Sequence, residues 1–592
     1  MVKEKKKKKS KKDKNKKEIE KKQTFIKQLR IAYSSLDNPK KFYLTIFLPL
    51  LLMGILVILL PFILDILIPI NLNLNLLTFI IGGIVPIIIG ILYPYISWKN
   101  KENDIDSKMH FFITHIRVLA ISDLSLKDII NMLGGKTVYG ALGDELKKIS
   151  VLSTQWRMPV SKTFRFISAR TPSKILKDFL DRFSQSLDSG VEHREFIETE
   201  QEAVIQKYKT MYESSNENII ILNEVYVSML IAIIFVMSMG IVLPIIMGTE
   251  NMNTFIYLSS FLLIISEGLL LYLLRAMLPA DEIWHLTGEK GKIEIKLDRV
   301  FKASVIACIF IGALLFFLIE NLEILFLKDN IEIVVAILIT PLISVGILTF
   351  KEEQNIIRKE SNFLGFLPAL GSISTMRGGK ITESVYYLSE KDYGVLTTHV
   401  RDLYRRLRTR IDDDESWEWF GVDTGSNFVQ RSSEMFREAT YAAANPRNVS
   451  KMISENMRKI RDLRIKKLTT VNTSIALFAG ITFGIAFAIY VSLIIGQHLN
   501  GIVGETSGQL GVTEAGTAVA PILYYIPPEM YTGTFTVIFI VLVIHCFMLS
   551  LTLKAIRGSH PYIVTLFFIP FVWIVAVTSF VVKLYIGGMM AG

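Results

Sequence analysis

The sequence predicts an all-α, polytopic membrane protein with about nine transmembrane helices and two helical-bundle cytoplasmic domains. The 592-residue chain is 51% hydrophobic and only 20% charged, whereas soluble domains usually carry about 25% charged residues. Several apolar runs reach the roughly 20 residues that a spanning helix needs. The polar stretches between them place their apolar residues at helical spacing rather than in strand alternation. A purely soluble enzyme is therefore not expected.

Residues 1–42 are predicted to be a Lys-rich, disordered cytoplasmic tail. They hold 17 Lys or Arg and 5 Asp or Glu, a net charge of +12, whereas the whole chain carries +11. The basic character therefore belongs to the tail, which has too few apolar residues to offset its ordering entropy. We interpret it as a solvated segment that sets topology near anionic membrane lipids. A specific arm that binds nucleic acid or docks a partner is the alternative for the tail, although among the partners of the whole chain we expect no nucleic acid.

Nine segments are long and apolar enough to span a bilayer. They cover residues 43–70, 76–97, 219–247, 254–276, 302–320, 331–350, 471–498, 532–553 and 562–588. Lys and Arg concentrate on the cytoplasmic side of membrane proteins, and the connections expected outside hold one such residue, Lys328. We therefore expect a multi-pass cell-membrane protein with a cytoplasmic N-terminus and an outside C-terminus.

These segments divide the chain into alternating membrane and cytoplasmic parts. The predicted transmembrane parts are helices 1–2 in 43–97, helices 3–4 in 219–276, helices 5–6 in 302–350 and helices 7–9 in 471–592, the last with an outside loop at 499–531. The predicted cytoplasmic parts between them are a first domain in 98–218, a short connection in 277–301 and a second domain in 351–470. We expect 191–218 and 448–470 to continue as helices into the membrane.

An internal duplication is indicated by a repeated motif. Tyr139-Gly140-Ala141-Leu142 recurs as Tyr393-Gly394-Val395-Leu396, and the same shift aligns most of the predicted membrane segments. The unit would be two helices, a cytoplasmic block and two more helices, with a ninth helix appended. Because four crossings are even, both copies have the same orientation. Many transporters instead carry inverted repeats.

Basic clusters in the second cytoplasmic block are candidates for docking an acidic partner. They comprise Arg401, Arg405, Arg406, Arg408, Arg410, Arg458, Arg461 and Arg464. Two alternatives stay open. The first five could form a solvated helix face neutralised by the acidic run 412–415, and the last three could be ordinary positive-inside anchoring.

The motifs tested for chemistry do not indicate an enzyme. Gly134-Gly135-Lys136-Thr137 resembles the end of a phosphate-binding loop, but Ile130 occupies the position where that loop needs a glycine. We interpret it as a helix-terminating turn. No Cys and His cluster has metal-ligand spacing, so no cofactor or metal is expected.

Two ionisable residues fall near the middle of predicted membrane helices. Glu267 and His545 occupy matching positions, each 13 residues after the start of its helix, at 254 and 532. Intramembrane charges are costly and often functional. A polar pair across the bundle is one hypothesis, and a separate local partner for each residue is the other.

The layout resembles the platform proteins of type IV filament machines, the family of the type II secretion F domain. The local resemblance rests on Ser372–Leu396, which carries a glycine turn, an amphipathic helix and Tyr393-Gly394-x-Leu396. The double unit with nine helices is most similar to the archaeal, archaellum-type members. The resemblance implies a non-enzymatic membrane scaffold, expected to be a homodimer.

The resemblance also implies the scaffold's partners. A hexameric secretion-type ATPase would dock on the cytoplasmic blocks, and filament subunits of the pilin or archaellin kind would be lifted from the membrane, with rotation in an archaellum. The alternatives are the platform of an archaeal adhesion pilus or secretion system and, from another class, a transporter or channel.

Overall fold

The computed structural model describes residues 29–33, 39–67, 76–247, 252–279, 281–321, 330–409, 412–509 and 528–591. Within these residues it consists of helices and connections, with one isolated antiparallel bridge between Trp284 and Ser426, which confirms the predicted all-α class. Most of the predicted Lys-rich tail, the middle of the predicted 499–531 loop and Arg410 lie outside the described residues.

The chain divides into two compact units. The first comprises Met1–Asp104 with Thr171–Lys174, and the second comprises Ile105–Arg170 with Ile175–Gly592. In the first unit the described helices are α2 (Pro39–Phe42), the π-helix η1 (Tyr43–Phe47), α3 (Leu48–Leu67) and the first part of α4 (Leu76–Ala120). Phe42 stacks on Tyr93 with ring centroids 5.8 Å apart, so an aromatic contact fixes the start of the helical hairpin that α3 and α4 form.

The first of the two predicted cytoplasmic blocks, in the second unit, is a bundle of short helices between two long ones. After the last part of α4 follow α5 (Leu126–Leu133), η2 (Thr137–Tyr139), α6 (Ala141–Thr154), α7 (Val160–Ser168), α8 (Lys174–Asp188) and α9 (His193–Met247). Helix α5 begins where the Ser125 side chain accepts a hydrogen bond from the backbone N–H of Asp128. Such an N-cap satisfies a donor that the first helical turn leaves unpaired.

The second block has the same kind of construction. It contains the last part of α14 (Ile343–Met376), α15 (Ile381–Ser389), η4 (Gly394–Leu396), α16 (Thr397–Arg408), α17 (Asp413–Thr424), α18 (Asn427–Tyr441) and the first part of α19 (Pro446–Gln509). Gly371 of α14 permits close packing on α19, because a Cβ there would lie 2.5 Å from the carbonyl oxygen of Pro446. The order of elements matches that of the first block. The duplication itself stays a prediction.

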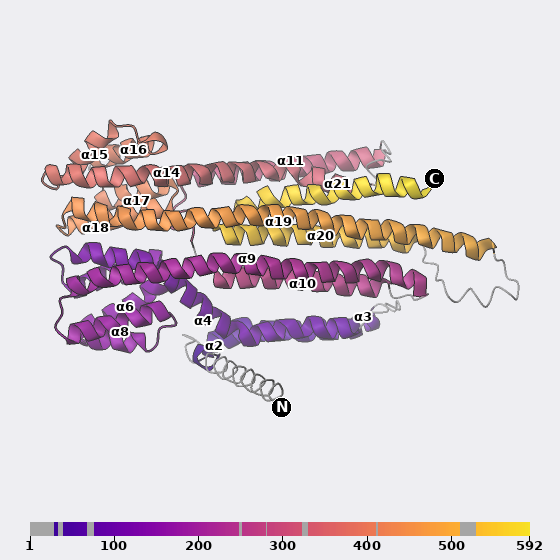
Figure 1. Cartoon of the computed structure of the whole chain (residues 1–592), viewed down its shortest axis with the longest axis horizontal. Coiled ribbons are helices and arrows are strands. Elements are labelled where there is room, and N and C mark those ends of the chain that lie inside the picture. Colours follow the sequence, from indigo (N-terminus) through magenta and orange to yellow (C-terminus); the bar gives the residue numbers. More distant parts are fainter. Residues whose placement is uncertain are drawn as a thin grey trace, which may run out of the picture. The chain divides into compact units, whose positions relative to one another are not determined.

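Long helices connect the blocks with the membrane part. The remaining helices are α10 (Met252–Met277), α11 (Lys292–Asn321), α13 (Ile331–Ile339), η3 (Thr340–Leu342), α20 (Pro528–Arg557), η6 (Pro561–Ile563) and α21 (Val564–Ala591). Within the second unit, α9 and α19 run side by side, with α10 against α9 and α20 packed on both α10 and α19 (Figure 1). The sequence predicted that 191–218 and 448–470 continue as helices into the membrane part. Helix α9 begins at His193 and is continuous through the first of these stretches, and α19 begins at Pro446 and is continuous through the second.

Seven helices among the described residues are long and apolar enough to cross a membrane. They lie within His193–Pro244, Thr254–Met277, Lys292–Glu320, Ile331–Met376, Pro446–Ile502, Gly533–Arg557 and Pro561–Ile586. They correspond to the last seven segments predicted from the sequence. The first two, 43–70 and 76–97, coincide with α3 and the first part of α4 but are not among the seven, so the count of nine stays a prediction.

One predicted membrane segment is interrupted. The segment predicted over 331–350 lies within the span Ile331–Met376, and a short 3₁₀ turn, η3, separates α13 from α14 inside it. Pro341 lies in this turn, and because proline has no backbone N–H it cannot continue the α-helical hydrogen-bond ladder. Trp573 of α21 donates a 3.0 Å hydrogen bond from Nε1 to Thr340 Oγ1, so the break is held by a neighbouring helix.

Candidate functional site

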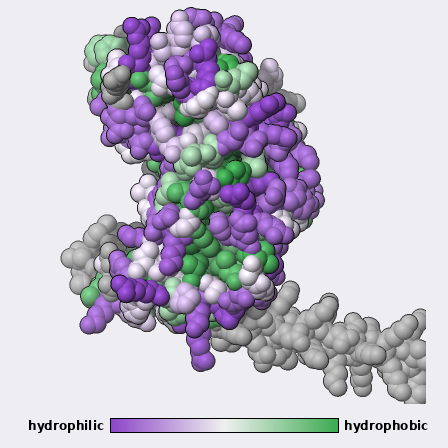
Figure 2. Space-filling model, turned by 90° about the vertical axis from the view of Figure 1, so that its left-hand side faces the viewer, coloured by the Kyte–Doolittle hydropathy of each residue, from purple (hydrophilic) through white to green (hydrophobic). Residues whose placement is uncertain are grey.

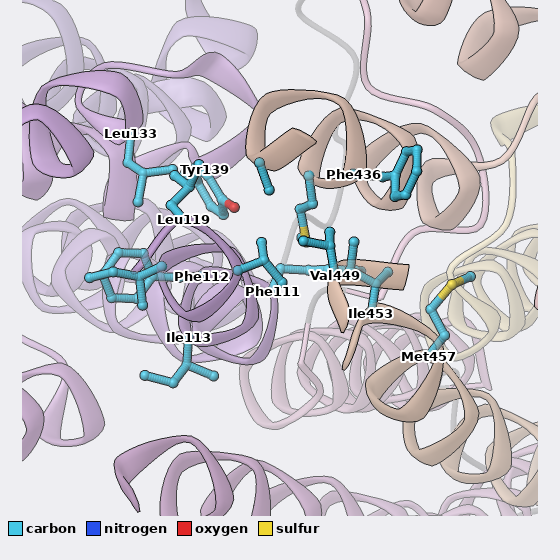
Figure 3. Packing of buried hydrophobic residues seen from close by; sticks show 14 of the residues in the cluster. Phe111, Phe112, Ile113, Leu119, Leu133, Tyr139, Phe436, Val449, Ile453 and Met457 are labelled. Carbon is cyan, nitrogen blue, oxygen red and sulfur yellow. The ribbon is translucent and has the colours of Figure 1, made fainter. Parts of the chain in front are cut away.

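The two blocks of short helices share one hydrophobic core. A single cluster of buried residues includes Phe111 and Phe112 of α4 together with Phe436 of α18 and Ile453 of α19. Figure 3 shows these side chains from both blocks gathered in one region. Phe111 also meets Phe428 of α18 edge to face, with centroids 5.6 Å apart. Because apolar burial is the main stabilising contribution in folding, this shared core holds the two blocks together.

A polar latch joins the same two blocks beside this core. Lys136 pairs with Glu434 at 2.6 Å and with Glu438 of α18. Glu438 also accepts from His115 of α4, whose Nε2 lies 3.1 Å away, while Nδ1 of that histidine is 2.8 Å from the Tyr139 hydroxyl. Burial raises the pKa of Glu438, but His115 and Lys136 outweigh this effect and bring the pKa to about 2. The carboxylate is therefore ionised and holds the latch closed.

The latch also accounts for the Gly-Gly-Lys-Thr motif. Lys136, the residue that would reach a phosphate in a nucleotide-binding loop, instead makes ion pairs with the second block. Gly135 has φ +81°, a left-handed conformation typical of a residue just past a helix end. The motif therefore serves as a turn that presents Lys136 to α18.

A buried charge cluster lies where the blocks of short helices meet the long apolar helices. Arg464 of α19 donates from Nη1 to both oxygens of Glu360 of α14, at 3.0 and 2.9 Å. Its Nη2 donates to Asp281 Oδ1 at 2.6 Å. Asp281 belongs to the connection between α10 and α11 and also accepts from the Tyr212 hydroxyl at 2.9 Å. Burial raises the pKa of Asp281, but Arg464 and Lys467 outweigh it and keep the pKa well below its usual range.

A second carboxylate lies two helical turns away on the same face of α14. Glu353, fully buried, accepts four hydrogen bonds. Its donors are Trp284 Nε1 at 3.3 Å, Arg557 Nε at 3.1 Å, Ser559 Oγ at 3.0 Å and the His560 backbone N–H at 3.1 Å. Because residues seven apart in a helix lie on one face, Glu353 and Glu360 form a carboxylate stripe on α14. The stripe fastens α19, the α10–α11 connection and the turn before α21 to one helix.

The first predicted docking cluster lies mainly on the surface. Arg401, Arg405 and Arg408 of α16 are exposed. Arg405 pairs with Asp402 at 3.1 Å, with its side chain 77% exposed. Arg406 differs, because it is partly buried in an ion pair with Asp423. Figure 2 views the end of the molecule where α15 and α16 lie, and hydrophilic residues predominate on that face. The exposed arginines are therefore accessible to a partner.

A groove of about 910 Å³ lies beside this cluster. Its lining includes Arg377, Tyr386, Tyr387, Tyr404, Arg408 and Asp412. The Arg377 guanidinium lies 3.7 Å from the centre of the Tyr387 ring, a cation–π contact that holds both side chains at the groove wall. The groove gives the surface around Arg408 both aromatic and charged contact groups.

The second predicted cluster is divided by burial. Arg458 is exposed and Arg461 is partly buried on α19. Arg464 is only 6% exposed and is engaged by two carboxylates. The interpretation of Arg464 as a docking residue therefore needs correction, because its guanidinium is buried and already forms ion pairs within the protein.

The two intramembrane residues lie in contact. His545 Nδ1 of α20 hydrogen-bonds Glu267 Oε1 of α10, and both side chains are at most 1% exposed. The Tyr226 hydroxyl of α9 donates to the same oxygen at 3.3 Å. Among the described residues, no hydrogen-bond partner lies at Glu267 Oε2 or His545 Nε2. Three membrane helices thus meet at one polar point.

Sequence reasoning did not single out the carboxylate stripe or Asp281. The available signal was the spacing of Glu353 and Glu360, seven residues apart in a helix that leaves the membrane. Their partners lie about 70 to 200 residues away in the chain, and no local pattern reveals such pairs.

The fold and this junction define a class, a polytopic helical membrane protein with two bundles of short helices between its long apolar helices. Residues 112–241 match the sequence profile of the type II secretion system protein F. The flagella accessory protein J of Methanocaldococcus jannaschii is 32% identical over 559 residues, which cover 93% of this chain and 96% of that protein. That of Methanococcus voltae is 31% identical over 558 residues, covering 93% and 97%. The chain therefore belongs to the flagella accessory protein J family. No solved structure matches it.

Proposed function

We propose that the chain is the membrane platform of an archaellum or a closely related type IV filament machine. The observation that carries this proposal is the similarity to two flagella accessory proteins J over 93% of the chain. In this proposal a cytoplasmic secretion-type ATPase docks on the two blocks, filament subunits contact the membrane helices, and the platform acts as a homodimer. ATP hydrolysis belongs to the partner, and this chain contributes no catalysis.

The continuous helices support a coupling role. Helix α9 spans His193–Met247 and α19 spans Pro446–Gln509, so each extends from a cytoplasmic block into an apolar, membrane-spanning part. At about 1.5 Å per residue, a rigid helix of this length carries a displacement at one end to the other. The carboxylate stripe of α14 would make α14, α19 and the turn before α21 move together. In an archaellum the same movement would drive rotation.

A platform of an adhesion pilus or secretion system is the second candidate. The match of residues 112–241 to the type II secretion system protein F favours it, because that profile describes a secretion component. Both candidates assign this chain the same position, between an ATPase and filament subunits. They differ in the filament that is built.

The exposed arginines of α16 are the proposed docking residues for the ATPase. Arg405 and Arg408 are the best test positions, because Arg401 donates to the Ser389 carbonyl and Arg406 pairs with Asp423. The detergent-solubilised full chain is incubated with the secretion-type ATPases of its cell, and the bound ATPase is measured. The double variant Arg405→Glu, Arg408→Glu should weaken binding and reduce its salt sensitivity, since rim charges act largely through screened electrostatics.

The matched control reverses two exposed lysines of the first block, Lys127→Glu and Lys162→Glu. It changes net charge equally and should bind the ATPase as the wild type does. Equal weakening by both variants would contradict local docking at α16. Failure of the wild-type chain to bind any of these ATPases would contradict the platform proposal itself.

A further inference from the structure

Helix α11 carries an exposed basic face at its N-terminal end. Lys292, Lys296, Arg299 and Lys302 are all exposed. At 100° per residue, the first three lie within about 60° of one another around the helix, and Lys302 lies next to them. They therefore form one continuous stripe over the first three turns.

Two acidic residues in the first turns of the same helix accept hydrogen bonds within the fold. Glu294 accepts from the Gly291 backbone N–H at 2.9 Å, and Asp298 accepts from the Tyr562 hydroxyl at 2.8 Å and from Lys290. Leu297 is fully buried between them. Glu294 and Asp298 are thus engaged within the fold, but Asp298 also interacts with Lys302, so the basic face rests mainly on Lys292, Lys296 and Arg299.

Further along α11, the outward face becomes apolar without interruption. Ile306, Ile309 and Phe310 are 67%, 68% and 70% exposed, and they continue the side of the helix on which the basic residues lie. The membrane-spanning window of α11 is only 11% buried within the molecule. Figure 1 shows α11 beside α14 at the edge of the bundle of the second unit. In a membrane protein, such an apolar face is covered by lipid tails.

We infer that the basic face of α11 binds the phosphate groups of anionic lipids. The exposed apolar turns fix the depth of the helix in the hydrocarbon, and the basic turns then lie at the level of the headgroups. The predicted topology places this end in the cytoplasmic leaflet. Lys and Arg near an anionic leaflet each add attraction to its lipids, so several together give a strong preference for anionic over zwitterionic lipid. The site would anchor the junction around the α10–α11 connection to the bilayer.

The test measures lipid binding by native mass spectrometry of the full chain in neutral detergent. Phosphatidylglycerol is the anionic probe and phosphatidylcholine the zwitterionic one. The variant that replaces Lys292, Lys296, Arg299 and Lys302 with Gln should lose roughly tenfold or more of the phosphatidylglycerol affinity. Its phosphatidylcholine affinity should be unchanged. The Lys-rich tail is present in every protein compared, so its contribution cancels.

The matched control replaces four exposed lysines of the cytoplasmic blocks and their extensions with Gln. They are Lys127, Lys162, Lys177 and Lys209. This control should bind phosphatidylglycerol within twofold of the wild type, and a charge-keeping variant with Arg at 292, 296 and 302 should bind fully. Equal losses in both Gln variants would overturn the proposal. So would full phosphatidylglycerol affinity in the α11 variant, particularly if that variant failed to bind an ATPase, because the face would then belong to a protein partner.

Discussion

Arg464 of α19 and Glu360 of α14 form a buried ion pair, with Nη1 at 3.0 and 2.9 Å from the two carboxylate oxygens. The pair joins two helices that each enter the membrane-spanning part, and Asp281 attaches the connection between α10 and α11 to the same guanidinium. A buried charge that loses its partner is costly, whereas the pair itself adds little net stability. We therefore expect the cluster to favour one arrangement of these elements over others.

The two members of this pair should respond unequally to substitution. Arg464→Met leaves two buried carboxylates with reduced compensation and should lower the free energy of unfolding by about 3–5 kcal/mol. Glu360→Gln leaves Arg464 paired with Asp281 and should cost only about 1–3 kcal/mol. Chemical unfolding of the solubilised chain in one detergent measures both. A larger loss for Glu360→Gln would contradict the assignment of Arg464 as the shared centre.

Glu353 should stabilise the turn before α21 through the hydrogen bonds that it accepts from this turn. Glu353→Ala removes the acceptor of the Ser559 hydroxyl and the His560 backbone N–H, so amide hydrogen exchange should rise around 558–563. Glu352→Gln is the control, because this neighbour on α14 is only partly buried and accepts a hydrogen bond from Asn355 of its own helix. Unchanged exchange in the Glu353→Ala variant would show that the turn is held by packing alone.

The latch between the blocks should depend on pH through Glu438. Its pKa falls from 4.5 to about 2 on folding, so its contribution to stability is present above pH 4.5 and is lost as the pH drops toward 2. The stability difference between the wild type and Glu438→Gln should therefore be largest near neutral pH. It should shrink between pH 4.5 and pH 2. A constant difference over this range would mean that the carboxylate is not ionised in the latch.

Glu267 and His545 should behave as one unit. Glu267→Gln and His545→Gln each leave the other side chain buried in the membrane part without its partner, so each single change should destabilise the chain. The double variant should cost less than the sum of the two, because coupled residues give non-additive effects. A double-mutant cycle on thermal stability measures this coupling. Additive losses would mean that the contact contributes nothing of its own.

The sequence predicted the large-scale organisation well for a simple physical reason. Long apolar runs and helical spacing are local properties, so the membrane helices from 219 onward and the continuation of α9 and α19 could be read directly from the chain. The break at Pro341 was missed, because a proline inside an apolar run reveals neither the turn type nor the neighbour that stabilises it.

The site could be predicted only in part. Matching positions in two predicted helices indicated Glu267 and His545, and the structure places them in contact. The arginines were chosen because many lie close together in the sequence. This clustering could not distinguish exposed Arg408 from buried Arg464. Burial depends on which helices pack together, and that information lies in contacts between distant segments.

Filament counts in cells test the platform proposal most directly. The gene for this chain is deleted, and surface filaments are counted by electron microscopy before and after the gene is restored. We expect loss of the filaments in the deletion strain and their return with the wild-type gene. A deletion strain that keeps normal numbers of every surface filament would contradict the proposed function.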